Sequence, residues 1–325
     1  MNVGVIGCGN IGLKRVQAMK DDVGTQIRAL VEVNPERSSL LKDKFGFLLR
    51  SEYREVLANN HIDAVVVSTP PNAAYQIILD CLQAGKHVLC EKPLGRSVEE
   101  AQAITKLAEA KRLVLKCGFN LRHDAGLIAA ASLLKEGKIG SPYFFKCSYV
   151  NGTVGVNANR VGSLLDMGTH IIDLAYWFIG GIKTVQAKLS RFEYDIESLD
   201  DNGFAILSSD TVTCMMHFSL VRWSNSFSLE VTGEKGTISV ENLPKWGTQH
   251  VTFQRRVFPA GIPETSSTSF EGDLSWANEW REFHRCVTNQ DMRWNTDGLR
   301  AMEVAALLRR SSEEGQTLTI KYEQP

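Results

Sequence analysis

The chain has 325 residues, 43% of them hydrophobic, and its 36 basic residues are balanced by 37 acidic ones. This length favours two domains over one. Without a basic stripe or a charged tail, the sequence predicts no nucleic-acid partner. No apolar run is long enough to span a bilayer. Because the chain enters a predicted strand at Asn2, we also expect no signal peptide.

Seven cysteines are scattered along the chain, mostly within apolar segments. Their odd number and their spacing are typical of reduced, buried thiols, and not of a disulfide framework or a zinc site. We therefore expect a cytoplasmic protein without a bound metal.

The first 34 residues predict a strand, a glycine turn, a helix and a second strand that ends in a carboxylate. The turn reads Gly7-Cys8-Gly9-Asn10-Ile11-Gly12, and Glu32 lies twenty residues beyond it. In such a unit the first glycine permits the tight turn and the second lets the backbone approach a pyrophosphate. The third lets the helix lie close to the strand, so that its N-terminal N–H groups face the phosphates.

This pattern predicts a dinucleotide site, although glycines of this spacing also mark ordinary turns. Glu32 is placed to accept hydrogen bonds from the ribose hydroxyls. Its charge favours NAD, because a carboxylate would repel a 2′-phosphate. Arg37 follows closely in the sequence and leaves NADP open.

Strand and helix signals alternate through the first 120 residues, which predicts βαβ units and a parallel sheet. Asn34 and Pro35 are typical of the N-cap and first position of a helix. Ser97 begins a capping box for another helix that extends to about residue 111. Buried strands are expected at 64–68, 88–90 and 114–118.

Ligands of open parallel sheets bind beyond the carboxyl ends of the strands. The glycine turn lies there, and so do Thr69-Pro70-Pro71-Asn72 and Glu91-Lys92-Pro93. We therefore expect Thr69, Pro70, Asn72, Glu91 and Lys92 to contact the cofactor. At its nicotinamide end, the Lys92 ammonium could stabilise negative charge on a substrate oxygen or share its proton. Taken alone, a lysine before a proline is more often a solvated loop residue.

After Asn120 the pattern changes to long strand candidates, many of which alternate in polarity, as in a sheet with one covered face. Residues 259–272 are rich in Ser, Thr, Pro and Gly and predict a surface loop. The expected plan is a doubly wound Rossmann domain over 1–120, then an α+β domain with a large antiparallel sheet over 121–325. The expected strands are 143–150, 184–192, 204–207, 211–220, 227–232, 237–240 and 251–258, and the expected helices are 123–135, 163–179, 275–289 and 296–310.

The helix expected at 163–179 carries a second candidate group. Asp166 and His170 are separated by four residues, so both project from one face of a helix. A carboxylate beside a histidine raises its pKa and fixes its orientation, which suits a base or acid acting on a carbinol. The alternative is an ordinary polar pair beside an apolar stripe. Asp173 could form a salt bridge or a cap, and lies outside the expected catalytic set.

Together these motifs resemble the glucose–fructose oxidoreductase, inositol dehydrogenase and rhizopine-catabolism family, usually called Gfo/Idh/MocA. The resemblance covers nearly the whole chain in order. It rests on the glycine turn, Thr69-Pro70-Pro71, Glu91-Lys92-Pro93, Gly118-Phe119-Asn120-x-Arg122 and Leu165-Asp166-x-Gly168-x-His170.

The resemblance implies a Rossmann domain followed by an open-faced, mostly antiparallel sheet domain through which homodimers or homotetramers form. It also implies that Lys92, Asp166 and His170 make up the catalytic group. His170 would move the hydroxyl proton of a sugar-like substrate, Asp166 would orient His170, and Lys92 would stabilise the oxygen. Asn120, Asn157 and Arg160 are candidates for holding the substrate, although each could equally be a loop residue that faces water.

Two features bear on the substrate. Family members often carry a glycine pair before the helix, whereas this chain has Val161-Gly162-Ser163. The region 223–237 resembles members from surface-polysaccharide gene sets more than inositol dehydrogenases, which adds a sugar nucleotide or another activated sugar to the candidate substrates.

We therefore expect an NAD(P)-dependent dehydrogenase or reductase that acts on a sugar, a cyclitol or a sugar nucleotide. Two alternatives remain: a non-catalytic sensor on the same fold, or an oxidoreductase with other chemistry, such as imine reduction or a tightly held cofactor. The intact trio of Lys92, Asp166 and His170 favours the enzyme, because a sensor does not need all three.

Overall fold

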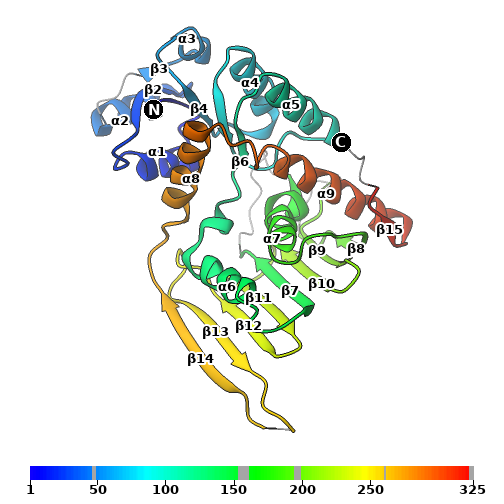
Figure 1. The fold of residues 1–325 in the computed structure, drawn as a ribbon. Coiled ribbons are helices and arrows are strands. Elements are labelled where there is room, and N and C mark those ends of the chain that lie inside the picture. The colour runs from blue at the N-terminus through cyan, green and yellow to red at the C-terminus, as the bar shows by residue number, and fades with distance from the viewer. Residues whose placement is uncertain (46–48, 153–160, 194–198, 260, 322–325) are drawn as a thin grey trace. The chain divides into compact units, whose positions relative to one another are not determined.

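The structure is a computed structural model that describes residues 1–45, 49–152, 161–193, 199–259 and 261–321 (Figure 1). The chain forms two compact units. The first contains Met1–Asn120 and Trp276–Met302, and the second contains Leu121–Ser275 and Glu303–Pro325. The sequence predicts a second domain over all of 121–325, whereas the segment 276–302 packs with the first unit. Among the described helices, none is both long and apolar enough to cross a membrane.

The first unit is built on a six-stranded parallel sheet with the order β3-β2-β1-β4-β5-β6. This order reverses between β1 and β4, which is the topology of a doubly wound Rossmann fold. The inner strands are short runs of small or β-branched apolar residues, and they are buried on both faces as such sheets require. The strands are β1 (Asn2–Ile6), β2 (Gln26–Val31), β3 (Leu49–Arg50), β4 (Ala64–Val67), β5 (His87–Cys90) and β6 (Leu115–Cys117).

Two helices of this unit begin at the N-caps that the sequence predicts. Asn34 Oδ1 accepts a hydrogen bond from the backbone N of Arg37 at 3.0 Å, and Ser97 Oγ accepts one from Glu100 N at 3.3 Å. These contacts confirm the two N-caps. The helices are α1 (Asn10–Met19), α2 (Pro35–Phe45), α3 (Tyr53–Leu57), α4 (Pro71–Gln83) and α5 (Val98–Ala110).

The segment 276–302 closes the core of the first unit. Trp280, Phe283 and Cys286 of α8 (Ser275–Asn289) are fully buried in one cluster with residues of β1 and α1. Their spacing of three residues puts them on one helix face. Helix α9 (Asp297–Glu314) begins in this unit and continues into the second.

The second unit contains a nine-stranded sheet within its described residues, with the order β14-β13-β12-β11-β7-β10-β9-β8-β15. All neighbours are antiparallel except β7 and β10, which confirms the mostly antiparallel sheet. Its helices are α6 (Ala125–Lys135), the π-helical turn η2 (Leu164–Gly168) and α7 (Thr169–Ile179), besides the end of α9; η1 (Asn120–His123) is a 3-10 turn. The strands are β7 (Pro142–Val150), β8 (Thr184–Ser190), β9 (Asn202–Ser208), β10 (Thr213–Ser219), β11 (Ser226–Gly233), β12 (Gly236–Glu241), β13 (Gln249–Arg255), β14 (Glu264–Phe270) and β15 (Leu318–Thr319).

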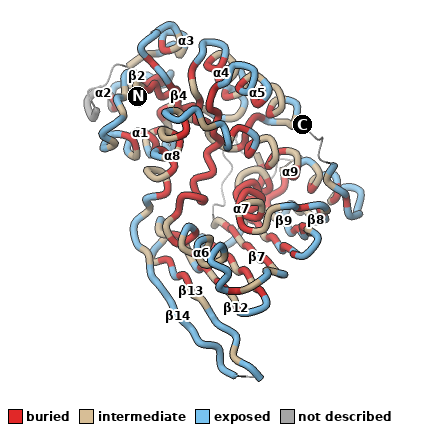
Figure 2. The backbone as a smooth tube through the Cα atoms, viewed as in Figure 1, coloured by how far each residue is buried: buried red, intermediate tan, exposed pale blue. Residues whose placement is uncertain are grey.

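Strand β14 corrects the loop expected at 259–272. It pairs antiparallel with β13 along its full length, from Glu264 opposite Arg255 to Phe270 opposite Gln249. Its Ser and Thr side chains are exposed on both faces, as Figure 2 shows for the strand as a whole. The sequence therefore lacks the alternation that marks a half-buried strand, although its backbone completes the sheet edge.

One face of the second sheet is packed and the other is open. Phe145, Cys147 and Tyr149 of β7 are buried, whereas Phe204 and Met215 on neighbouring strands are 54% and 46% exposed. Such exposed apolar side chains on one sheet face are typical of an interaction surface.

Candidate active site

The register of the parallel sheet brings the predicted cofactor segments to one edge. Ile6, Val67, Cys90 and Cys117 are direct neighbours across β1, β4, β5 and β6. The next backbone N–H groups continue the ladder: Ser68 N donates to Ile6 O at 2.8 Å, and Glu91 N donates to Val67 O at 2.9 Å. The glycine turn, 68–72, 91–93 and 118–120 therefore follow the carboxyl ends of adjacent strands.

The glycine turn has the geometry that a dinucleotide requires. Gly7 has φ of +86°, and a Cβ there would lie 2.8 Å from Thr69 N. A Cβ on Gly12 would lie 2.0 Å from Gly7 O, so only glycine lets α1 approach β1 this closely. At Gly9, by contrast, the one described atom that a Cβ would meet is Arg37 Nη1, at 3.4 Å. Gly9 thus leaves room above the N-terminus of α1 for a phosphate.

Cys8 belongs to this turn, and its side chain interacts electrostatically with the carboxylate of Glu32. Cys8 is 1% exposed, and its pKa is raised to about 12 by burial and by the charge of Glu32. Its thiol is therefore a neutral core group. Glu32 is also buried and follows β2, where its Oε1 accepts a hydrogen bond from Asn34 N at 2.9 Å. This contact fixes a carboxylate at the edge where the ribose acid was expected.

Two buried hydroxyls point to a polar ligand beside the turn. Ser68 Oγ and Thr69 Oγ1 are shielded from solvent, and among the described residues neither has a hydrogen-bond partner. Buried polar groups are seldom left unpaired. Together with the open cradle at Gly9 and the fixed Glu32 carboxylate, these hydroxyls fit a bound dinucleotide. Pro70 and the exposed Asn72 follow at the start of α4.

Lys92 lies at the same edge of the first unit. It is partly exposed, whereas Pro93 and Leu94 that follow it are buried. Glu91, immediately before it, is held through its side chain by Arg15 of α1, whose Nε donates to Glu91 Oε1 at 2.8 Å. Burial lowers the pKa of Arg15, but the carboxylates of Glu279 and Glu91 raise it more, so the net shift is upward and Arg15 stays charged.

The Asp166–His170 segment is helical, but its first turn is wider than the sequence predicts. Residues 164–168 form the π-helical turn η2, and α7 begins only at Thr169. Thr169 Oγ1 donates to Leu165 O at 2.9 Å and so takes up a carbonyl of this turn. A single π turn inside a helix is often found at functional sites. Asp166 is half-buried within it, and His170 is 6% exposed on α7.

Asp200 caps this helical segment from a distant part of the chain. Its Oδ2 accepts hydrogen bonds from Ser163 Oγ at 2.6 Å and from Leu164 N at 2.7 Å, and Arg309 lies 3.3 Å from its Oδ1. Gly162, with φ of +83°, brings the chain close to this carboxylate. No local motif marks Asp200 in the sequence, because its partners are 36 and 37 residues earlier.

The surroundings of His170 add two residues that the sequence analysis missed. The Tyr149 ring of β7 meets the His170 ring edge to face, with centroids 5.8 Å apart. Lys245, in the loop after β12, donates from Nζ to Tyr149 Oη at 2.8 Å and lies 4.5 Å from the Trp246 ring centroid. Tyr149 reads in the sequence as one more inward residue of an alternating strand, so no signal set it apart.

The remaining candidates are placed as follows. Asn120 is buried at the end of the first unit, whereas Asn157 and Arg160 lie outside the described residues. Asp173 forms a buried bidentate pair with Arg122, at 2.6 and 2.5 Å, which confirms it as a salt-bridge residue.

Within the described part of the chain, no three His, Cys, Asp or Glu side chains are grouped to hold a metal. All seven cysteines are buried and free of disulfides.

Family models match both units. The model described as an oxidoreductase family with an NAD-binding Rossmann fold matches residues 1–119, and the Gfo/Idh/MocA C-terminal domain matches 127–239. Inositol 2-dehydrogenase 3 of Saccharopolyspora erythraea is 26% identical over 287 residues, covering 86% of this chain and 84% of that protein.

Solved structures with the same fold include complexes with nicotinamide cofactors. Levoglucosan dehydrogenase with NADH and L-sorbose has a TM-score of 0.90 at 20% identity, over 99% of both chains. A mutant of a 3-ketoreductase from Actinomadura kijaniata, with TDP-benzene and NADP, has a TM-score of 0.82 at 25% identity over 96% of this chain and 97% of that one.

These matches agree with the parallel sheet, the glycine turn and the open antiparallel sheet. They confirm the resemblance on which the sequence analysis relied, and with it an enzyme whose first unit binds NAD. The chain belongs to the Gfo/Idh/MocA family of NAD-binding oxidoreductases.

Proposed function

We propose that this oxidoreductase moves a hydride between nicotinamide and a secondary alcohol or ketone carbon of a sugar, cyclitol or sugar nucleotide. One observation carries the proposal: the same chain holds Lys92 at the dinucleotide edge of one unit and a buried histidine four residues after Asp166 in the other. The proposal is that Lys92, Asp166 and His170 act together on one substrate oxygen.

The bound nicotinamide supplies a hydride donor or acceptor, and the protein supplies position and proton transfer. The cofactor would be held by residues 7–12, by Glu32 at the ribose, and by Thr69, Pro70, Asn72, Glu91 and Lys92 along the sheet edge. The unpaired hydroxyls of Ser68 and Thr69 support this assignment. Arg37, beside Gly9, keeps NADP open as a second cofactor.

In this proposal His170 takes the proton of the substrate hydroxyl during oxidation and returns it during reduction. Asp166 orients the imidazole and binds a neighbouring hydroxyl. The Lys92 ammonium stabilises the oxygen as negative charge develops on it. Tyr149 packs against His170, which limits the rotation of the ring.

The substrate class is supported by relatives that are named for cyclitols and anhydrosugars, and by the 3-ketoreductase structure with a TDP compound. Asn120, Asn157 and Arg160 are the residues proposed to hold the substrate hydroxyls. The exposed apolar side chains of β9 and β10 support a homodimer or homotetramer joined through the open sheet face. The seven buried thiols support a cytoplasmic protein.

The test uses the full chain. Quenching or enhancement of NADH fluorescence gives cofactor affinity, and a panel of inositols, anhydrosugars, aldoses and sugar nucleotides is screened at the nicotinamide absorbance band. Lys92→Ala and His170→Ala should each lower kcat about 100-fold or more while NADH still binds, because each removes a group that acts on the reacting oxygen.

Matched controls are Lys106→Ala and His250→Ala, which change exposed residues of the same types on α5 and β13. Both should keep full turnover. A chain that binds NADH but turns over no member of the panel would support the sensor alternative instead. Equal activity of wild type and Lys92→Ala would refute the proposed catalytic group.

A further inference from the structure

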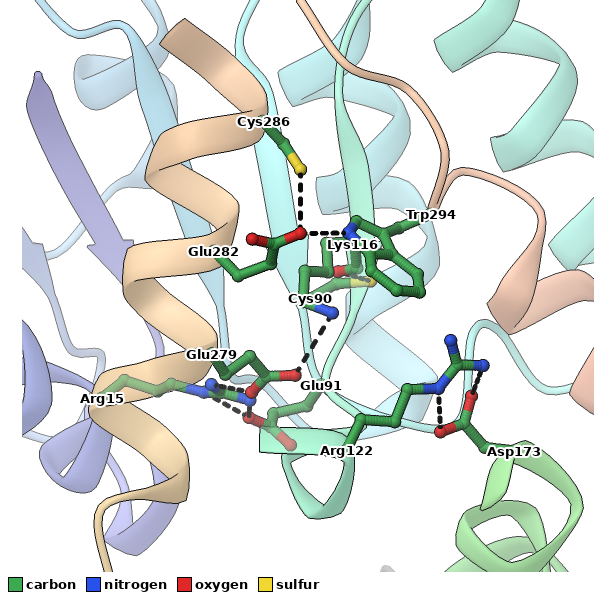
Figure 3. A network of polar contacts seen from close by, with 10 residues as sticks. All are labelled: Arg15, Cys90, Glu91, Lys116, Arg122, Asp173, Glu279, Glu282, Cys286 and Trp294. Atoms are coloured by element: carbon green, nitrogen blue, oxygen red, sulfur yellow. Dashed lines mark hydrogen bonds and ion pairs between the residues drawn. The ribbon is translucent and has the colours of Figure 1, made fainter. Parts of the chain in front are cut away.

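A group of four charges, three of them buried, links helix α8 to the strand ends of the first unit (Figure 3). Arg15 of α1 and Glu279 of α8 form an ion pair, and their side chains are 1% and 0% exposed. Arg15 also pairs with Glu91 through Nη2, at 2.7 Å. Lys116 of β6 lies 3.8 Å from Glu279, and its side chain is 3% exposed. Two cations and two anions thus balance; three of them are buried, and the fourth, Glu91, has a side chain that is 16% exposed.

The packing around this group leaves it little freedom. The Arg15 guanidinium lies 4.4 Å from the ring centroid of Trp276, and Lys116 lies 4.9 Å from that of Trp294. A Cβ on Gly118 would come within 2.7 Å of Arg15 Nη2. The glycine that follows β6 therefore leaves room for the guanidinium. These neighbours restrict the orientations open to the planar guanidinium.

Such a group is a poor way to gain stability, because the desolvation of buried charges offsets most of their attraction. We therefore attribute the role of this charge group to the geometry that it imposes on the residues beside it. The geometry concerns Glu91, because both contacts of Arg15 with this residue fall on Oε1. Glu91 N is in turn bonded to Val67 O, so backbone and side chain of this residue are both fixed.

Lys92 directly follows Glu91, so the contacts that hold Glu91 also restrict the position of Lys92. On its other side Leu94 is 1% exposed, and a Cβ on Gly298 of α9 would lie 2.8 Å from Leu94 Cβ. The segment 276–302 therefore supports the Lys92 segment from both sides, through Glu279 and Arg15 before it and through Gly298 after it.

We propose that Arg15 and Glu279 are positioning residues for Lys92, and that the return of 276–302 to the first unit serves to fix this lysine. The inference rests on the proposed role of Lys92. It accounts for the burial of Arg15, Glu279 and Lys116 at this strand end and for the packing of α8 with the cofactor-binding unit. Neither residue is required to touch substrate or cofactor.

The test compares Glu279→Gln with Glu282→Gln, the same change one helical turn away on α8. Glu282 contacts Trp294 and Arg285 and is not bonded to Arg15. Hydrogen exchange followed by mass spectrometry of the full chain with NAD bound reads the result without turnover. We expect the amides of 91–96 to exchange at least about ten-fold faster in Glu279→Gln, with 71–83 unchanged. Glu282→Gln should leave both segments as in wild type.

The second measurement is kcat, determined with the compound of the panel that gives the highest turnover as substrate. Glu279→Gln should lower kcat about 10- to 100-fold, since a misplaced group about 1 Å away from its position costs up to ~100-fold. The Kd for NADH should stay within about three-fold of wild type. In a Lys92→Ala background the same change should lower kcat no further, because its effect acts through Lys92.

A further variant separates positioning from charge balance. Removing Glu279 alone leaves a buried excess of positive charge, which could unfold the unit. The double variant Glu279→Gln, Lys116→Met restores the charge balance but not the ion pair between Arg15 and Glu279. If 91–96 exchanges as in wild type in this double variant, the positioning role is refuted. If Lys92→Ala keeps full activity, the proposed function fails, and the exchange experiment still decides whether α8 fixes this segment.

Discussion

Asp200 Oδ2 accepts a hydrogen bond from Ser163 Oγ at 2.6 Å, and the same oxygen accepts one from Leu164 N. A residue just before β9 thereby supplies the cap that the local sequence does not provide. The turn that it caps is the wide π turn with Asp166, and His170 follows on α7. The start of this helix is therefore fixed by a tertiary contact.

Asp200→Ala should lower the free energy of unfolding by about 2 kcal/mol, because a buried N–H and a hydroxyl lose a charged acceptor. It should also lower kcat more than it raises KM, since the helix start would no longer be fixed. Urea unfolding and steady-state kinetics measure the two effects. Asp210→Ala is the control, because Asp210 pairs only with the exposed Lys183 within the described residues and should change stability by less than about 0.5 kcal/mol.

Gly9 and Gly12 should respond differently to the same added methyl group. Gly12→Ala places a Cβ against Gly7 O and should cost about 3 kcal/mol of stability. Among the described residues, Gly9→Ala meets the Arg37 side chain alone, so the fold should lose no more than about 1 kcal/mol. NADH affinity should nevertheless fall at least about ten-fold in Gly9→Ala, because its methyl group occupies the place where a pyrophosphate approaches the backbone.

Calorimetry and an NADH titration separate the two outcomes. Gly85→Ala is the control for backbone strain alone: Gly85 has φ of +74° and no described neighbour within reach of a Cβ, so the variant should lose about 1 kcal/mol of stability and keep its NADH affinity. Normal NADH binding by Gly9→Ala would show that the phosphates do not pass over this residue.

The sequence was informative wherever function depends on local spacing. The glycine turn, its carboxylate Glu32 and the strand-end segments 69–72 and 91–93 all follow short buried strands, and parallel pairing then requires them to share one edge. The sequence also carried both N-caps, because Asn34 and Ser97 act on residues three positions away.

The sequence was uninformative wherever the partner is distant. The pair Arg15–Glu279 spans 264 residues, and nothing in the helical period of α8 says which unit its buried face will cover. For the same reason the sequence boundary at 121–325 missed the return of 276–302. At the π turn of 164–168 the Thr169 hydroxyl donates to Leu165 O, and Gly168 lies close to Phe218. The spacing of four residues between Asp166 and His170 reveals neither contact.

Cofactor choice should depend on the balance between Glu32 and Arg37. Glu32→Ala removes the carboxylate that would repel a 2′-phosphate, so the ratio of NADP to NAD affinity should rise at least about ten-fold. Adding Arg37→Ala should reverse part of this gain, because its guanidinium lies beside Gly9. Fluorescence titrations with both reduced cofactors measure the ratios. The exposed Glu36→Ala is the matched control, and an unchanged ratio in Glu32→Ala would show that the ribose contact lies elsewhere.

Because of the contact between α8 and the loop after α1, we expect the thermal stability of the protein to fall at acid pH. Asp22 accepts hydrogen bonds from Thr25 Oγ1 at 2.5 Å and Trp280 Nε1 at 3.2 Å, and His284 Nδ1 lies 3.1 Å from its Oδ2. Burial raises the pKa of Asp22, but these contacts lower it more, so the net shift is downward.

A carboxylate with a depressed folded-state pKa stabilises the protein above its unfolded value of about 4, and this contribution is lost as the pH falls through the folded-state pKa. Thermal unfolding between about pH 6 and pH 3 should therefore show wild type losing Tm below about pH 4 more steeply than Asp22→Asn, which cannot titrate. Asp21→Asn, at the neighbouring and largely exposed carboxylate, should keep the wild-type slope. Equal slopes for wild type and Asp22→Asn would mean that this carboxylate does not stabilise the contact between α8 and the loop after α1.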